Sequence, residues 1–209
     1  QVDIVRIDHF RGLEAYWKIP GRARTAMDGQ WVKGPGEKFF LSLQREFGSL
    51  PFVAEDLGVI TENVVKLREK FAFPGMHVLH FSLGQNEAGR IGSLPVENMI
   101  AYTGTHDNNT TIGWYQEDLS SSEKVAVASF LGVKPEYANV ICQRLIEHAY
   151  ESAARAVIVP MQDILALGSR HRMNKPGTVE SNWKWRMQQG MLKPELSQRL
   201  QKLCQKYQR

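Results

Sequence analysis

Three short apolar runs of the sequence each end on an acidic side chain, a type that can transfer protons or attack an electrophilic carbon. The three acids are Asp8, Glu55 and Asp107. In a parallel α/β barrel the carboxyl end of every strand opens on the same face, so acids that follow separate strands converge there. A single acid at a strand end more often caps a helix or closes a turn. Three acids in the same context favour a catalytic group.

Paired carboxylates suit the cleavage of a glycosidic bond with retention of configuration. One ionised carboxylate attacks the sugar, and a second, protonated one, about 5 to 5.5 Å away, donates to the leaving oxygen. Arg6 lies two residues before Asp8, and therefore on the same strand face, where its charge can hold Asp8 ionised. We therefore interpret Asp8 as the nucleophile and Glu55 as the acid.

A sugar site also needs flat apolar faces on which the rings can stack. Trp17 follows Asp8, and Trp114 follows Asp107. Any single aromatic is more often a core or surface residue than a platform. The position of these two after expected strand ends favours a stacking role.

The elements that must position these residues alternate along the chain. Apolar runs predict strands at residues 4–7, 52–54, 76–81, 99–102 and 156–161. Helical periodicity predicts helices at residues 37–47, 61–71, 122–131, 135–155 and 194–207. Buried strands that alternate with helices indicate parallel βα units, in either a doubly wound sheet or a (β/α) barrel. We expect one domain over residues 1–209, with a long loop at 81–99.

The composition is that of a globular protein with a real core, because 43% of the 209 residues are hydrophobic and 23% are charged. No apolar stretch reaches the roughly 20 residues needed to cross a bilayer, and the start lacks signal-peptide zones. We therefore expect a cytoplasmic protein, or one of the plastid stroma in a plant, without membrane contact. The basic segment 170–209 reads as a solvated helical face, and no nucleic-acid motif accompanies it, so no nucleic-acid partner is expected.

Two further patterns are weak as functional signals. The stretch from Gly34 to Lys38 lacks the spacing of a phosphate loop and is interpreted as a turn before a helix. His77 and His80 lie three apart in an expected strand and would point to opposite faces, so a shared metal is not expected. Cys142 and Cys204 lie far apart, which favours two reduced thiols.

Six segments of the sequence resemble the 4-α-glucanotransferases called amylomaltase or disproportionating enzyme, family 77 of the glycoside hydrolases. The three strongest are RIDHFRG at residues 6–12, AEDLG at 54–58 and GTHDN at 104–108. The later segments are PMQD at 160–163, RMN with PG at 172–177, and NW with WR at 182–186. Their order matches the family, and the likeness covers nearly the whole chain.

This resemblance implies a (β/α)8 TIM barrel of the α-amylase type that acts on α-1,4-glucans and maltooligosaccharides by double displacement. Asp8 would attack the anomeric carbon, Glu55 would serve as acid and then base, and Asp107 would hold the sugar hydroxyls. The remaining implied roles are an orienting one for Arg6, a hydrogen bond to the sugar for His106, and a place along the same cleft for Asn182. No metal or organic cofactor would be required.

The resemblance also implies that the chain is the C-terminal part of a barrel. Asp8 would end the fourth strand, so the chain would hold about strands four to eight, and the full-length protein would supply the missing N-terminal half. A partial barrel exposes strand edges, so inactivity of this piece alone is one outcome that stays open. Two alternatives stay open: an α-glucan hydrolase with the same carboxylates, and a glucan-binding fragment without catalysis.

Overall fold

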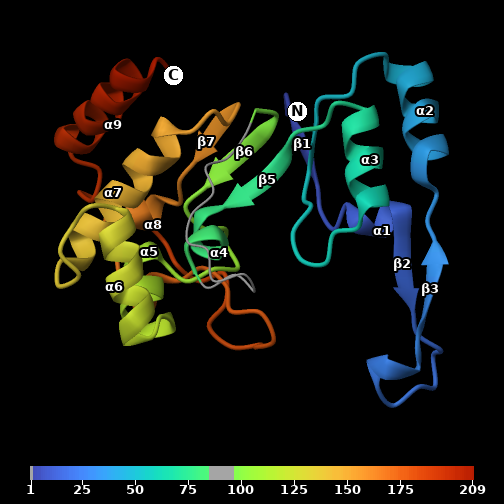
Figure 1. The fold of residues 1–209 in the computed structure, drawn as a ribbon, viewed down its shortest axis with the longest axis horizontal. Helices are drawn as coiled ribbons and strands as arrows, with labels where there is room; N and C mark the ends of the chain where they lie inside the picture. Colours follow the sequence, from blue (N-terminus) through green and yellow to red (C-terminus); the bar gives the residue numbers. More distant parts are fainter. Residues whose placement is uncertain (1, 85–96) are drawn as a thin grey trace. The chain divides into compact units, whose positions relative to one another are not determined.

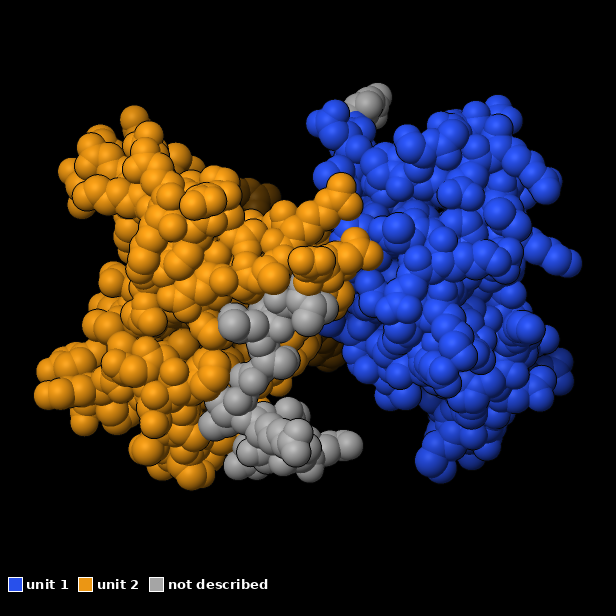
Figure 2. Space-filling view, turned by 45° about the horizontal axis from the view of Figure 1, so that its top comes forward, with its two compact units in different colours: residues 1–76 blue, residues 77–209 orange. Residues whose placement is uncertain are grey.

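A computed structural model of the chain describes residues 2–84 and 97–209. The chain divides into two compact units, Gln1–Met76 and His77–Arg209, which Figure 2 shows in blue and orange. The expectation of one domain over residues 1–209 stays a prediction. Most of the predicted loop at 81–99 lies outside the described residues.

The first unit is built on two parallel strands, β1 (Val5–Ile7) and β4 (Phe52–Ala54), as their apolar runs predicted. Ile7 pairs with Ala54 in this ladder, so the two strands end side by side. The helices of this unit are α1 (Arg11–Glu14), α2 (Gly36–Phe47) and α3 (Glu62–Lys70). A buried aromatic cluster that includes Phe10, Phe40 and Phe73 fills the core.

An antiparallel hairpin, which the sequence reading did not predict, follows α1. Its strands are β2 (Ala15–Lys18) and β3 (Gln30–Lys33), and a 3-10 turn, η1 (Ala26–Asp28), lies between them. Trp17 and Trp31 face each other across this ladder. The turn predicted before the next helix is confirmed, because α2 begins at Gly36.

The second unit contains a three-stranded sheet in the order β5 (Gly75–Val78), β6 (Met99–Tyr102), β7 (Ala156–Ile158), with β6 and β7 parallel (Figure 1). The shorter helical segments are α4 (Leu79–Leu83), α5 (Thr111–Gly113), the π-type η2 (Trp114–Asp118), α8 (Met161–Ile164) and η3 (Ser169–His171). The longer helices are α6 (Ser121–Phe130), α7 (Ala138–Glu151) and α9 (Pro194–Tyr207). Helix α7 buries Ile141, Leu145 and Ala149 at helical spacing against this unit's core.

Two strand predictions were too long. The run 76–81 is a strand only to Val78, after which the chain turns into α4, and the run 156–161 ends at Ile158. Apolar runs this short do not distinguish a strand from a buried helical turn. His80 therefore lies on a helix, so the alternation argument about His77 and His80 was wrong in its premise. Within residues 2–84 and 97–209 no group of three His, Cys, Asp or Glu is placed to hold a metal ion.

None of the residues of helix α9 is fully buried, although Leu203 packs against a core cluster, and polar contacts join this helix to α7. Lys206 Nζ lies 2.6 Å from Glu147 Oε1, and the Tyr207 hydroxyl donates to the same oxygen at 3.0 Å. Glu147 also pairs with Arg144. The hydrogen bonds from Lys206, Tyr207 and Arg144 lower the pKa of Glu147 from 4.5 to about 2.

The last residue of the chain continues this attachment. Arg209 donates to the carbonyl oxygens of Tyr150 at 2.8 Å and Ala154 at 2.6 Å, which lie at and beyond the C-terminal end of α7.

No helix in the described part of the chain is long and apolar enough to cross a membrane.

Candidate active site

The end of β1 presents Asp8 with its predicted arginine partner. Arg6 Nη2 lies 2.5 Å from Asp8 Oδ1, which confirms that the two side chains share one strand face. The Asp8 side chain is 75% exposed, so its carboxylate is open to a ligand. The second terminal nitrogen of Arg6, Nη1, lies 3.7 Å from Met76 Sδ, which limits where the guanidinium can move.

Glu55 is fixed to the same turn by both its backbone and its side chain. Its carboxylate accepts hydrogen bonds from the backbone N–H of His9 at 2.8 Å and of Leu57 at 3.1 Å. Its backbone N–H donates to Ile7 O at 2.9 Å, and its carbonyl accepts from Phe10 N at 3.0 Å. The structure therefore places the two predicted carboxylates on neighbouring strands, with direct bonds between the two turns.

His9, which follows Asp8, adopts a left-handed backbone conformation with a φ of 47°. This conformation is uncommon for a residue with a side chain and costs of order 1 kcal/mol or more, so the surrounding contacts must maintain it. The bond from His9 N to Glu55 is one of those contacts. The left-handed turn at His9, the residue after Asp8, therefore directs the His9 N–H towards the Glu55 carboxylate.

Asp56, next to Glu55, has a structural role instead. Its Oδ2 lies 3.1 Å from Arg68 Nε, with both side chains nearly buried, and its Oδ1 accepts from Met76 N at 2.8 Å. This acid joins α3 to the start of β5. Asp56 is therefore a strand-end acid with a structural role.

The hairpin aromatics are partly occupied by contacts within the first unit. Trp17 donates its indole N–H to Ala26 O at 2.7 Å and meets Trp31 edge to face at a centroid distance of 5.3 Å. The Arg11 guanidinium lies 4.0 Å from the centre of the Trp31 ring. Trp17 remains 40% exposed, which leaves part of its ring available for a sugar.

In the second unit, Asp107 is held by a segment that follows η3. Asn174 Nδ2 donates to Asp107 Oδ1 at 2.6 Å, and Arg172 Nη2 donates to the Asp107 carbonyl oxygen at 2.6 Å. Asn174 N also donates to His106 O at 3.1 Å. His106 Nε2 lies 3.5 Å from Asp107 Oδ2. Neither Arg172 nor Asn174 was predicted to be a site residue. The one sequence signal for them was the family resemblance of the segment RMN at 172–174.

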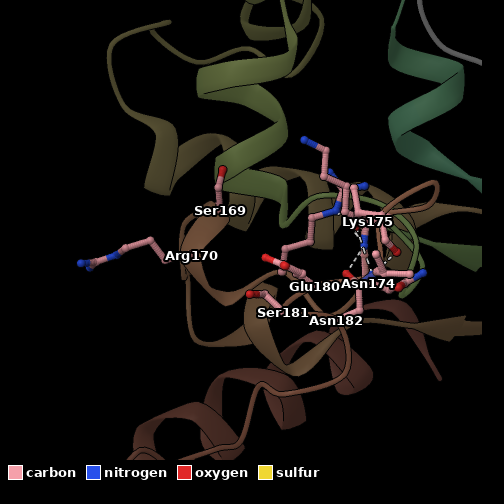
Figure 3. A pocket seen from close by; sticks show the side chains of 10 residues that line it. Ser169, Arg170, Asn174, Lys175, Glu180, Ser181 and Asn182 are labelled. Carbon is pink, nitrogen blue, oxygen red and sulfur yellow. Dashed lines mark hydrogen bonds between the residues drawn. The ribbon is translucent and has the colours of Figure 1, made fainter.

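Asn182 lies in a turn beside this segment, and its side chain is already bonded. Its Oδ1 accepts from Lys175 N at 2.9 Å and its Nδ2 donates to Thr178 O at 2.8 Å. A hollow of about 590 Å³ is formed here, and Figure 3 shows Asn174, Lys175 and Asn182 gathered together while Arg170 points away. Asn182 therefore shapes the turn that lines this hollow.

Trp183 is the exposed aromatic of this region. Its ring lies 5.2 Å from the His106 ring, and its backbone is left-handed with a φ of 61°. Trp114, by contrast, is only 7% exposed and stacks on His80 at 4.5 Å with an interplanar angle of 9°. The interpretation of Trp114 as a sugar platform was wrong, because this ring packs in the core.

The predicted site residues thus form one group in each unit. The first unit brings together Arg6, Asp8 and Glu55, with Trp17 on the adjoining hairpin. The second unit places His106 and Asp107 together and Asn182 in the neighbouring turn. Their roles stay predictions.

Comparisons with known proteins agree on one family. The family model Glyco_hydro_77, described as 4-alpha-glucanotransferase, matches residues 1–193. The 4-alpha-glucanotransferase of Thermus thermophilus is 45% identical over 208 residues, which cover 97% of this chain and 41% of that protein. The chloroplastic/amyloplastic 4-alpha-glucanotransferase of Solanum tuberosum is 44% identical over 186 residues, or 88% of this chain and 32% of that protein.

A solved structure extends the match to the fold. The amylomaltase from Streptococcus agalactiae in complex with acarbose superposes with a TM-score of 0.91 at 34% identity, over 99% of this chain and 42% of that one. The chain has the fold of the corresponding part of a TIM barrel of the α-amylase type. It spans about two fifths of the length of the curated relatives that it matches. By sequence and by fold, the chain belongs to glycoside hydrolase family 77, the 4-alpha-glucanotransferases.

Proposed function

We propose that this chain carries the catalytic carboxylates of a 4-alpha-glucanotransferase, which moves a segment of an α-1,4-glucan to the 4-hydroxyl of glucose or another glucan. One observation supports this proposal most directly. Ile7 and Ala54 are paired on neighbouring parallel strands, so Asp8 and Glu55 are the next residues on each. Neighbouring strands lie about 4.8 Å apart, which is close to the roughly 5 to 5.5 Å that separate the two carboxyl groups of retaining enzymes.

In the first step, Asp8 attacks the anomeric carbon and forms a glycosyl ester while the bond to the leaving oxygen breaks. Glu55 gives its proton to that oxygen, so the departing glucan leaves as an alcohol. Arg6, 2.5 Å from Asp8, keeps the attacking carboxylate oriented. The bond from His9 N to Glu55 Oε2 ties the proton donor to the turn of the nucleophile.

In the second step, the 4-hydroxyl of the acceptor attacks the glycosyl ester and releases Asp8. Glu55 takes the proton of that hydroxyl and is ready for the next cycle. Asp107 holds the sugar hydroxyls as the ring distorts, and His106 donates a hydrogen bond to the same sugar. Trp17 offers a stacking face, and Asn182 shapes the cleft. Both steps move only a glycosyl group and a proton, which carboxylates do without a metal or organic cofactor.

The proposed substrates are α-1,4-glucans and maltooligosaccharides, which fits the acarbose complex of the Streptococcus agalactiae amylomaltase. The proposed location is the cytoplasm, or the plastid stroma in a plant, since several plant relatives are named chloroplastic/amyloplastic. We propose that the part of the relatives that this chain does not match completes the active protein.

The test is incubation with maltotriose, with the products separated by chromatography. The chain is assayed alone and as a fusion with the unmatched part of the Thermus thermophilus relative. We expect a ladder of longer maltooligosaccharides from the fusion, lost by on the order of 10⁴-fold in Asp8→Asn. Asp28→Asn, at an exposed position outside the site, is the matched control and should retain the ladder.

Two results would contradict the proposal. Release of glucose and maltose without longer chains would indicate that water is the acceptor, and therefore a hydrolase. A folded fusion that binds maltooligosaccharides without making product, and binds equally well as Asp8→Asn, would indicate a glucan-binding protein.

A further inference from the structure

A single buried carboxylate, that of Asp163, binds both ends of the segment that carries His106 and Asp107. At the start of the segment, Thr103 Oγ1 donates to Asp163 Oδ2 at 2.7 Å. At its end, Thr111 N donates to Oδ1 at 2.7 Å and Thr111 Oγ1 donates to Oδ2 at 2.7 Å. We propose that Asp163 is a positioning residue for the reaction, which fixes this segment so that His106 and Asp107 meet the sugar in one geometry.

Burial of the Asp163 carboxylate costs free energy of folding, so we expect the residue to have a specific role. Asp163 is 2% exposed, and both threonines are fully buried. Burial raises the pKa of Asp163, although the hydrogen bonds from Thr103 and Thr111 act in the opposite direction. Among the described residues no Lys, Arg or His forms an ion pair with this carboxylate. Its hydrogen bonds come from three uncharged donors, which take the place of the water molecules that would surround an exposed carboxylate.

His80 extends the anchor to the opposite side of the segment. Its Nε2 lies 3.0 Å from Thr111 Oγ1, whose single proton is given to Asp163, so His80 must be the donor in this pair. Burial lowers the pKa of His80 to about 3, which favours the neutral ring, and the contact with Thr111 favours the form with its proton on Nε2. His80 N also donates to Thr103 O at 3.2 Å. Trp114 stacks on the ring and prevents it from turning.

The anchored segment has its own internal order between the two fixed ends. Asn108 Oδ1 accepts from Thr105 N at 2.8 Å and from Thr105 Oγ1 at 2.9 Å. Asp107 N donates to Thr105 Oγ1 at 3.2 Å. This turn sets the direction of Asp107, but only if its ends stay in place. A displacement of about 1 Å at a reacting group can cost on the order of 100-fold in rate.

This inference rests on the proposed function for its catalytic meaning, but the anchor itself can be tested without catalysis. The first measurement is amide hydrogen exchange of the chain, comparing Thr111→Val with Thr111→Ser. Valine keeps the shape and removes the hydroxyl, whereas serine keeps the hydroxyl. We expect exchange at residues 105–108 to rise about tenfold in Thr111→Val, with Thr111→Ser close to the parent chain and the amides of α7 unchanged in both.

The second measurement is kcat and KM for transfer from maltotriose in the active fusion. We expect kcat to fall about 10- to 100-fold in Thr111→Val and Asp163→Asn per folded molecule, with a smaller change in KM and with Thr111→Ser near the parent value. Thr111→Val keeps the test decisive if Asp163→Asn does not fold.

Three outcomes would overturn the inference. The first is unchanged exchange at residues 105–108, and the second is an equal rise in α7, which would indicate general destabilisation. The third is locally faster exchange with an unchanged kcat. If the parent fusion makes no transfer product, the proposed function fails, while the exchange comparison still decides whether Asp163 anchors the segment.

Discussion

Replacement of Gly104 by alanine should destabilise the second unit, because a methyl group has no room at this position. A Cβ on Gly104 would lie 2.8 Å from His80 Cε1, 2.9 Å from His80 Nδ1 and 3.2 Å from Asn108 Cβ. The imidazole cannot retreat, since it stacks on Trp114 at 4.5 Å and is bonded to Thr111 at 3.0 Å. Either the ring or the backbone of residues 103–111 must shift.

Overpacking of this kind costs typically about 1 to 3 kcal/mol. For a protein of this size a central value of about 2 kcal/mol lowers Tm by about 4 to 8 °C. The assay is thermal unfolding followed by circular dichroism. Gly168→Ala is the matched control in the same unit, because a Cβ there meets nothing within 4 Å and its φ of −83° suits alanine. We expect its Tm to stay within about 1 °C or to rise slightly.

The same substitution made in the His80→Ala variant tests whether the His80 ring causes the loss of stability. In His80→Ala the ring is gone, so adding Gly104→Ala should cost less than half of what it costs in the parent chain. Equal Tm values for Gly104→Ala and Gly168→Ala, or an unchanged cost in His80→Ala, would refute the reasoning. Either result would mean that His80 does not hold the place described for it.

Three further substitutions separate structural from catalytic roles. The folded state lowers the pKa of Glu147, so this carboxylate adds about 2 kcal/mol to the free energy of unfolding above pH 4.5, and the gain is lost as the pH falls towards 2. Glu147→Gln should remove this gain, which urea unfolding at pH 7 and pH 3 measures. Asp56→Asn breaks the buried pair with Arg68 and should cost about 3 kcal/mol in urea unfolding, whereas kcat per folded molecule should stay within about twofold. Asn174→Asp puts a second carboxylate where a donor lay 2.6 Å from Asp107, so transfer should fall about 100-fold, and activity that survives this change would contradict the assigned contact.

The strands that carry the carboxylates were predictable because a short run rich in apolar residues that ends at a polar one leaves a strong local signal. The run before Glu55 is apolar on both faces, whereas the run before Asp8 includes Arg6 and its strand is partly exposed. Each run ends at a polar residue. The hairpin after α1 was not predicted, because Trp17 was interpreted as a stacking face after a strand end and not as the cross-strand partner of Trp31. Helix α4 was missed because a run of six apolar and polar residues fits a strand equally well.

The candidate site was predictable where partners are close in sequence and unpredictable where they are distant. Arg6 and Asp8 are two residues apart, so strand alternation alone places them together. Asn174 and Asp107 are 67 residues apart, and their contact depends on how two separate loops fold. The same limit applies to Asp163, whose partner Thr111 lies 52 residues away and which local sequence marks only as an acid in a short helix.

The way in which α9 is attached has a consequence for how the chain opens. Leu203 packs against a core cluster, and ion pairs and hydrogen bonds from Lys206 and Tyr207 join this helix to α7. None of its residues is fully buried, so detachment of this helix exposes less apolar surface than opening of the core, and it also breaks ion pairs that salt and acid weaken. We expect α9 to behave as a separate cooperative unit that detaches and reattaches many times before the core that includes α7 unfolds once.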